Sequence, residues 1–405
     1  MATQNRDLST LRATFVSQIE SAAYVTTPAY RSPSNKTAYV KKITITNNTS
    51  SSGTFDVGVY DTSYNSNGNL FIVPAASTTT VAYSTNGFSW STSTLPSTAS
   101  WQDVAYGNGR YVMVSYGSTT GAISTDGITW STSTLPSASN WISIAYGNGI
   151  FVTVSRTSGS TAAYSTDGVT WSTSSIVGWP NNGQKIVFGN GRFVAIANST
   201  STAYYSTDAI TWTSTNVIYT ANTSMAFGNG LFVISNNTSN PVYSTDAITW
   251  NYSYWPSTSV QTWKDITFGN GTFVAIQQGA TYATYAASSS DGITWTYRSI
   301  SSASNYYWIQ YGNGQFVAGQ YNAQPIATST DGITWTSGSL PSSSTWINCG
   351  YPRKSDFTSD SYLYKSVSLA SNTTQSIPIE IMLPAMQEIR VRSTVPMQVT
   401  INGEV

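Results

Sequence analysis

Seven times along the chain, with small variations, the sequence repeats the stretch Ser124-Thr125-Asp126-Gly127-Ile128-Thr129-Trp130. Successive copies are 38 to 45 residues apart, and they end at Trp90, Trp130, Trp171, Trp212, Trp250, Trp295 and Trp335. A second marker, Gly-Asn-Gly, keeps step with the first at 107–109, 147–149, 189–191, 228–230, 269–271 and 312–314. A period near 40 residues with several strand-like runs per copy is typical of the blades of a β-propeller.

Each repeat is expected to contain four strands, which in the copy around Trp130 are 101–106, 110–115, 121–124 and 128–130. Asn108-Gly109 suits a type I′ hairpin between the first two strands, because both residue types tolerate positive φ. Ala209 and Ala247 replace the glycine of the heptapeptide in two copies. Because positive φ penalises alanine, we expect that turn not to be a strict type I′ turn but one in which the aspartate caps backbone N–H groups.

The broken ends of the repeat region predict a closed ring. Residues 346–351 match a first strand, but Pro352-Arg353-Lys354 replaces Gly-Asn-Gly and the repeat stops. At the other end, the region begins with a second strand at 69–73. The strand at 346–351 is therefore expected to complete the blade that begins at 69–73. This gives a seven-bladed propeller over 67–354 with no free edge.

Alternating apolar and polar residues predict strands on both sides of the repeats, at 38–47, 54–60, 361–369, 374–383, 387–394 and 396–402. Neither group alone suffices for a stable sandwich. We therefore expect one split β-sandwich, built from 36–66 and 355–405, that serves as an anchoring domain with the propeller inserted into it. The predicted fold class is all-β.

Residues 1–35 are interpreted as an N-terminal arm. Leu8, Leu11, Phe15 and Ile19 have the spacing of a short amphipathic helix. The arm could dock on a neighbouring subunit, or it could be a frayed or locally packed terminus.

The composition excludes several classes of function. Charged residues make up 8% of the chain, 17 basic residues balance 17 acidic ones, and there is no histidine. No basic field exists to attract nucleic acid, and a histidine general base, a Cys/His zinc site and an internal disulfide are excluded. The one cysteine, Cys349, is expected to be a buried strand residue. No signal peptide or membrane-spanning stretch is visible, so a soluble protein without membrane insertion, metal or cofactor is predicted.

The heptapeptide resembles the Asp-box (BNR-type) repeats of sialidase-like propellers, with one residue fewer between Asp126 and Gly127 and with Asn86 in place of the aspartate in the first copy. The resemblance covers roughly 69–351 and implies a propeller in which the motif is structural and far from any active site. The low charge, the Ser/Thr/Asn-rich strands, the near-identical repeats and the split sandwich also resemble virion proteins of tailed bacteriophages, including phages of marine cyanobacteria.

Catalytic candidates are few. No glutamate occurs between Glu20 and Glu380, and the arginines of the repeats share no common position. A glycosidase needs paired carboxylates, and outside the turn motifs the repeats contain only Asp103 and Asp265. We expect both to line the central channel, hydrated or hydrogen-bonded. The motif aspartates could be imagined as metal ligands, but each is alone in its turn, so we interpret them as structural caps: Asp126, Asp167, Asp208, Asp246, Asp291 and Asp331.

Binding, if present, is expected at the end of the sheets opposite the Gly-Asn-Gly and Asp turns. We name the end with the Gly-Asn-Gly and Asp turns the turn end, and the opposite end the loop end. Loop-end aromatic residues suit sugar rings, or else they close the lid of the core. The candidate ligand-binding residues are Trp179, Tyr219, Tyr252, Tyr254, Trp255, Tyr297, Arg298 and Tyr306, with Trp255 as the first choice.

The sequence thus predicts a non-enzymatic phage virion protein, assembled in the host cytoplasm, whose propeller attaches to a host-surface glycan. The alternative is a capsid, neck or baseplate decoration or scaffolding protein without a receptor role. The expected partners are other virion proteins through the sandwich and the arm, with a homo-oligomer and a host glycan as further candidates.

Overall fold

The computed structural model divides into two compact units, Met1–Asn65 with Asp356–Val405, and Ser66–Ser355. It describes residues 12–19, 26–31, 38–47, 53–61, 70–157, 162–198, 200–237, 239–255, 262–277, 285–300, 306–321, 324–341, 346, 350, 362–370, 373–383, 387–393 and 397–404. All named elements of these residues are β-strands, so the all-β prediction is confirmed. A helix that could cross a membrane is absent from the described ranges. Cys349, Leu8 and Leu11 lie outside the described residues.

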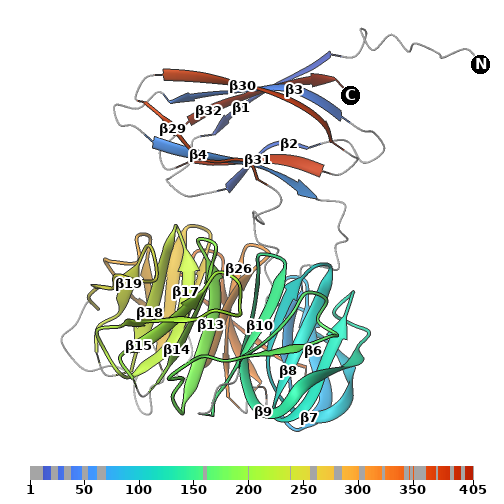
Figure 1. Ribbon diagram of the computed structural model, residues 1–405, viewed down its shortest axis with the longest axis vertical. Helices are drawn as coiled ribbons and strands as arrows, with labels where there is room; N and C mark the ends of the chain where they lie inside the picture. The colour runs from blue at the N-terminus through green and yellow to red at the C-terminus, as the bar shows by residue number, and fades with distance from the viewer. Residues whose placement is uncertain are drawn as a thin grey trace, which may run out of the picture. The chain divides into compact units, whose positions relative to one another are not determined.

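The unit that contains both termini has two antiparallel four-stranded sheets, which lie one above the other in Figure 1. One has the order β1–β32–β3–β30, with β1 (Arg12–Ile19), β32 (Met397–Glu404), β3 (Ala38–Asn47) and β30 (Thr373–Leu383). The other has the order β2–β31–β4–β29, with β2 (Thr26–Arg31), β31 (Gln387–Ser393), β4 (Gly53–Asp61) and β29 (Tyr362–Leu369). Strands from the two ends of the chain alternate in both sheets, and the six predicted strands are all present.

The predicted N-terminal helix is wrong. Residues Arg12–Ile19 form strand β1, which pairs with β32 along its whole length, Phe15 opposite Ile401 and Ile19 opposite Met397. Residues 12–19 do not alternate strictly between apolar and polar side chains, since Phe15 and Val16 are both apolar and Ser17 and Gln18 are both polar, so the local pattern alone does not indicate a strand. Pairing with β32 therefore outweighs the helical spacing, and β1 and β2 are strands of this unit rather than a separate arm over 1–35.

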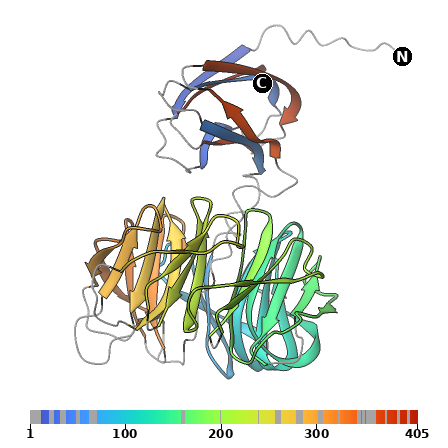
Figure 2. The ribbon, with the colours of Figure 1, turned by 60° about the vertical axis from the view of Figure 1, so that its left-hand side comes forward.

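The unit Ser66–Ser355 consists of sheets that follow one another along the chain (Figure 2). Four sheets have four consecutive strands each. They are β13 (Gly183–Gly189) to β16 (Thr213–Asn216), through β14 (Arg192–Ala197) and β15 (Thr202–Ser206); β17 (Asn222–Gly228) to β20 (Asn251–Tyr252), through β18 (Leu231–Asn236) and β19 (Val242–Ser244); β21 (Trp263–Gly269) to β24 (Thr296–Ser299), through β22 (Thr272–Gln277) and β23 (Tyr285–Ser289); and β25 (Tyr306–Gly312) to β28 (Thr336–Ser339), through β26 (Gln315–Gln320) and β27 (Pro325–Ser329).

The remaining strands form an eight-stranded sheet in chain order: β5 (Phe71–Pro74), β6 (Thr78–Ser84), β7 (Ser91–Gly107), β8 (Arg110–Ser124), β9 (Ser131–Gly147), β10 (Ile150–Ser155), β11 (Ala162–Ser165) and β12 (Ser172–Ser174). Each of its long strands pairs with two neighbouring strands, one along its first part and the other along its second part. The first part of β7 pairs with β6, and its second part, from Ser100 to Gly107, pairs with β8. The fourth strand of one repeat and the first strand of the next are therefore one continuous strand here.

The predicted fourth strand, 128–130, is displaced. In the structure, it begins after the tryptophan, at Ser131 in β9. The N–H groups of Ile128 and Thr129 donate instead to Asp126 Oδ1, at 2.8 and 2.7 Å, so they are not available to a neighbouring strand.

The two ends of the repeat region pair with each other, as predicted. Ile72 and Gly350 exchange two backbone hydrogen bonds of 2.9 Å, and Ala75 forms an antiparallel bridge with Trp346. Phe71, Val73 and Trp346 share one buried cluster with Trp308 of β25. The first and last repeats are therefore joined by both backbone pairing and apolar packing.

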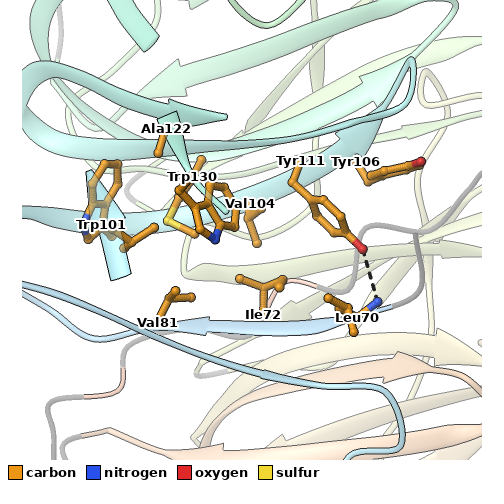
Figure 3. Close-up of a cluster of buried hydrophobic side chains, with 11 residues drawn as sticks. Leu70, Ile72, Val81, Trp101, Val104, Tyr106, Tyr111, Ala122 and Trp130 are labelled. Carbon is orange, nitrogen blue, oxygen red and sulfur yellow. Dashed lines mark hydrogen bonds between the residues drawn. The ribbon is translucent and has the colours of Figure 1, made fainter. Parts of the chain in front are cut away.

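Buried clusters join neighbouring repeats. In the cluster of Figure 3, Ile72 and Val81 of the first repeat pack against Trp101 and Trp130 of the next. The hydroxyl oxygen of Tyr111 reaches back to accept a 3.3 Å hydrogen bond from the Leu70 N–H. Burial of each large apolar side chain contributes about 1.5–3 kcal/mol, so contacts between repeats are a main source of stability.

Candidate functional site

The two sequence markers meet at the turn end. Both Asn108 and Gly109 have positive φ, 47° and 75°, as a type I′ turn requires. The Asn108 side chain donates to the Thr166 carbonyl, inside the Asp turn of the next repeat, at 3.2 Å. The equivalent bonds are Asn148 to Thr207, Asn190 to Thr245, Asn229 to Ser290 and Asn313 to Thr85. This contact explains why the two markers keep a fixed phase.

Each motif aspartate holds its own turn. In the repeat of Asp167, one carboxylate oxygen accepts from the Val169 and Thr170 N–H groups, both at 2.8 Å, and from the Ser165 hydroxyl at 2.9 Å. The Thr170 N–H is the main cause that lowers the pKa of the Asp167 carboxyl. Burial opposes the shift at Asp126, but the hydrogen bonds from Thr129 and Ile128 still lower its pKa. These carboxylates act on their own backbone.

The glycine position of the Asp turn does require positive φ. Gly127 has φ 73°, and Ala209 and Ala247 adopt 65° and 60° at the same position. The turn is nevertheless not of type I′, as predicted, because that type requires positive φ at both central residues and the preceding aspartates, Asp126, Asp208 and Asp246, do not have it. Both alanine side chains are fully buried, so apolar burial offsets part of the cost of the left-handed conformation.

The first strands of the repeats surround a polar channel. Asp103 of β7 accepts through Oδ2 from the Ser143 hydroxyl and the Ile144 N–H of β9, at 2.8 and 3.2 Å. The same oxygen is 3.4 Å from Lys185 Nζ of β13. Asp103 thus ties three successive first strands together, and its other oxygen accepts from the Val104 N–H at 3.0 Å.

Asp265 repeats this arrangement on the other side of the channel. It accepts from the Ser224 hydroxyl of β17 at 2.6 Å and from the Ile309 N–H of β25 at 2.8 Å. Burial raises the pKa of Asp265, although Lys185 and these hydrogen bonds act in the opposite direction. Burial also opposes the charge of Lys185, but Asp103 and Asp265 outweigh it and raise its pKa.

A cavity of about 380 Å³ opens where this channel reaches the loop end, and we name it the channel mouth. The second residues of the six described first strands line it, namely Gln102, Ile142, Gln184, Thr223, Lys264 and Tyr307. Arg156 and Tyr321, which directly follow β10 and β26, and Tyr116 of β8 also line it. Lys185 and Asp265 lie at its base, because they also line a deeper cavity of about 220 Å³.

Three of the predicted ligand-binding aromatic residues are buried, which favours the alternative that they close the lid of the core. Trp255 is only 8% exposed, stacks on Trp263 with ring centroids 3.9 Å apart and donates through Nε1 to the Ser239 carbonyl at 3.1 Å. Trp179 packs on Tyr204 and donates to the Ser155 carbonyl, and Tyr306 is fully buried. Each of these three side chains packs inside the protein, as expected if they close the lid of the core.

Three other candidates come together on the surface. Tyr252 and Tyr254 are 49% and 62% exposed, and their rings stack at 6.5 Å with an interplanar angle of 23°. Tyr219 meets Tyr252 edge-on at 5.8 Å. We name these three residues the tyrosine cluster. Tyr252 lies at the loop end because it pairs with Val242, the first residue of β19.

Tyr297 and Arg298 are half-buried on β24. Tyr297 lies parallel to Trp263 at 6.3 Å, and Arg298 Nε donates to the Ser288 hydroxyl at 2.8 Å. Both are engaged within their own sheet.

Sequence reasoning missed most of the channel mouth, including Lys185, Lys264, Tyr116, Tyr307 and Tyr321. A signal was present, since alignment of the repeats places Asp103, Ser143 and Lys185 in one column of the first strand. Polar residues in one column of a buried strand indicate a shared polar axis.

No protein-family model matches the sequence, and no curated protein matches it. Among solved structures, virginiamycin B lyase from Staphylococcus aureus is similar, at 10% identity and a TM-score of 0.50, over 86% of this chain and 99% of that one. Its catalytically inactive histidine-to-alanine variant with quinupristin is also similar, at 11% identity and a TM-score of 0.51, over 71% of this chain and 100% of that one. YCF48 bound to D1 peptide has 17% identity and a TM-score of 0.49, over 76% and 94%. The first two likenesses show the fold alone, a β-propeller.

Proposed function

We propose that this chain is a non-enzymatic virion protein of a tailed bacteriophage, whose repeat unit binds a glycan of the host surface. The tyrosine cluster carries the proposal. Exposed, mutually stacked phenol rings offer apolar faces to sugar rings and hydroxyl groups to their substituents. Tyr252 and Tyr254 are exposed although most large aromatic side chains of the unit are covered, and an exposed aromatic group of this kind is typical of a recognition surface.

We further propose that the repeat unit is a seven-bladed ring and that the two sheets of the terminal unit form a β-sandwich which binds other virion proteins. Counting the paired Trp346 and Gly350 as the missing strand of the first repeat supports seven blades. The alternation of N-terminal and C-terminal strands in both sheets supports a single anchoring domain. Assembly into a virion, in the host cytoplasm, follows from the sequence resemblance, and a homo-oligomer would fit it.

A binding function is favoured over catalysis by the state of the channel carboxylates. Both Asp103 and Asp265 already accept hydrogen bonds from neighbouring strands. The lyase neighbour is inactive when one histidine is replaced by alanine, and this chain contains no histidine.

Glycan-array binding of the full chain tests the proposal. The variant Tyr252→Ala with Tyr254→Ala should lose about thirtyfold in affinity, the effect of losing an aromatic anchor worth about 2 kcal/mol. Phe88→Ala is the matched control, because it removes an aromatic ring that is 47% exposed at the turn end. Equal binding by the native chain and the double variant, with unchanged melting temperatures, would overturn the assignment.

One observation favours the alternative, a decoration or scaffolding role. The residue after the glycine position of the Asp turn is apolar in every repeat, and six of these side chains are at least 36% exposed: Phe88, Val169, Ile210, Ile248, Ile293 and Ile333. Such residues suit contacts with neighbouring proteins. If the Phe88→Ala control, rather than the tyrosine variant, weakens incorporation into particles and no glycan binds, the scaffolding role is the better one.

A further inference from the structure

The few charged side chains of the repeat unit are concentrated around its channel. Outside the Asp turns, the described residues of 66–355 include eight: Asp103, Arg110, Arg156, Lys185, Arg192, Lys264, Asp265 and Arg298. Five of them line the two connected cavities. In a chain with only 8% charged residues, most of the charged side chains outside the Asp turns therefore lie along one axis.

The charge at the channel mouth is positive. Arg156, Lys185 and Lys264 face one carboxylate, that of Asp265, whose oxygens already accept three hydrogen bonds. Lys185 is balanced by Asp103 at 3.4 Å. Among the described residues, neither the Arg156 guanidinium nor the Lys264 ammonium has a carboxylate within salt-bridge distance. A recess with walls of low dielectric focuses such a field.

Aromatic residues hold and frame these cations. Lys264 Nζ lies 3.9 Å from the centre of the Tyr307 ring, and Tyr307 in turn packs on Tyr321 with centroids 5.0 Å apart. This cation–π contact fixes the ammonium group without neutralising it. Tyr116 and Tyr321 are 38% and 47% exposed at the rim, and Gln184 adds an amide. A cavity of about 380 Å³ lies within the range of roughly 300–1,000 Å³ that small-ligand sites occupy.

We infer that the channel mouth binds an anionic sugar residue, one that carries a carboxylate or a sulfate group. Arg156 and Lys264 bind the anion, and the exposed phenols of Tyr116 and Tyr321 contact the ring. This inference rests on the proposed glycan function and deepens it: the tyrosine cluster, at the same loop end, takes the neutral residues of the glycan, and the channel mouth selects glycans that also carry charge.

Titration calorimetry of the full chain with glucuronic acid, glucose 6-sulfate and glucose tests the inference. Both anionic sugars should bind at least about tenfold more tightly than glucose, since one hydrogen bond to a charged group is worth about that factor. Raising the ionic strength should reduce the difference, because the cations are partly exposed. The two anionic probes distinguish a carboxylate ligand from a sulfate ligand.

The variant Arg156→Gln with Lys264→Gln should abolish this tenfold preference. The variant Arg110→Gln with Arg192→Gln is the matched control, because it removes the same net charge from the start of β8 and of β14, at the turn end. Equal binding of anionic and neutral sugars, or equal losses in both double variants, would overturn the inference. If the inference is overturned but neutral glycans still bind through Tyr252 and Tyr254, the proposed function survives. If anionic sugars bind as expected but no glycan binding depends on the two tyrosines, the proposed function fails and the anion site stands.

Discussion

At the scale of single residues, the first glycine of each Gly-Asn-Gly has a steric role. A Cβ on Gly189 would overlap the ring of Phe227, and the same relation joins Gly107 to Tyr146 and Gly228 to Phe268. From the second Gly-Asn-Gly to the sixth, the aromatic residue before the marker therefore packs on the glycine of the preceding repeat. Close packing between repeats explains why an aromatic residue and a glycine recur together.

The substitution Gly189→Ala should lower the free energy of unfolding by about 1–3 kcal/mol, because the added methyl group forces the Phe227 ring to move in a packed interface. Gly338→Ala is the control, since a Cβ there meets only the Ile326 side chain at 3.2 Å, and it should change stability by less than about 0.5 kcal/mol. Urea unfolding measures both. Equal effects would show that the interface tolerates the methyl group.

The residue types of the sequence sufficed to predict the aspartate caps of the turns, but they did not predict which aromatic side chains are buried. Asp167 could be assigned to its turn because serine, aspartate and glycine at fixed spacing suffice to define local hydrogen bonds. Trp255 and Tyr254 are adjacent and both aromatic, yet one is 8% and the other 62% exposed. That difference depends on Trp263 and Trp295, which reach Trp255 from other parts of the chain, and a sequence read along one segment contains no such information.

At the scale of elements, strands with clean alternation were predicted closely, and β1 was missed. The predicted 38–47 is β3 (Ala38–Asn47), and the predicted 374–383 differs from β30 (Thr373–Leu383) by one residue. β1 lacks this alternation, and the spacing of Phe15 and Ile19 fits a helix as well as a strand. The partner that decides between the two, β32, is nearly 400 residues away along the chain.

The closing strand around Trp346 provides the test at this scale. Deletion of 345–351 removes the partner of Ile72 and Ala75 and exposes the edge of β5, and exposed edges promote aggregation. We expect a lower melting temperature and aggregates on size-exclusion chromatography. Trp346→Ala keeps the backbone but empties a fully buried position, and it should cost about 3–5 kcal/mol. A soluble deletion variant with an unchanged melting temperature would refute closure.

At the scale of the whole molecule, the aspartates predict a response to pH. The six motif aspartates have pKa values lowered from the ordinary 3.8. Their stabilising contribution is present above the ordinary value and is lost as the pH falls through the lowered values. The raised pKa of Asp265 has the opposite effect on stability. Its stabilising contribution is present at low pH and is lost as the pH rises through the raised pKa. Six groups outnumber one, so stability should fall below about pH 4.

Thermal unfolding between pH 2 and pH 7 measures this response. The variant Asp167→Ala with Asp208→Ala should be less stable than the native chain at neutral pH and should lose less on acidification, because two of the linked carboxylates are absent. Parallel melting curves for the two proteins across the acid range would contradict the assignment.

Two of the recurring links between repeats lie at the turn end and leave the loops of the opposite end free of that role. The asparagine bonds and the aromatic–glycine contacts all lie at the turn end. The longest copy, which ends at Trp295, adds its residues at the loop end, between β20 (Asn251–Tyr252) and β21 and between β22 and β23. Evolution can therefore lengthen or exchange loops there without rebuilding the ring, and a foreign peptide inserted between β22 and β23 should be displayed on a scaffold that still folds.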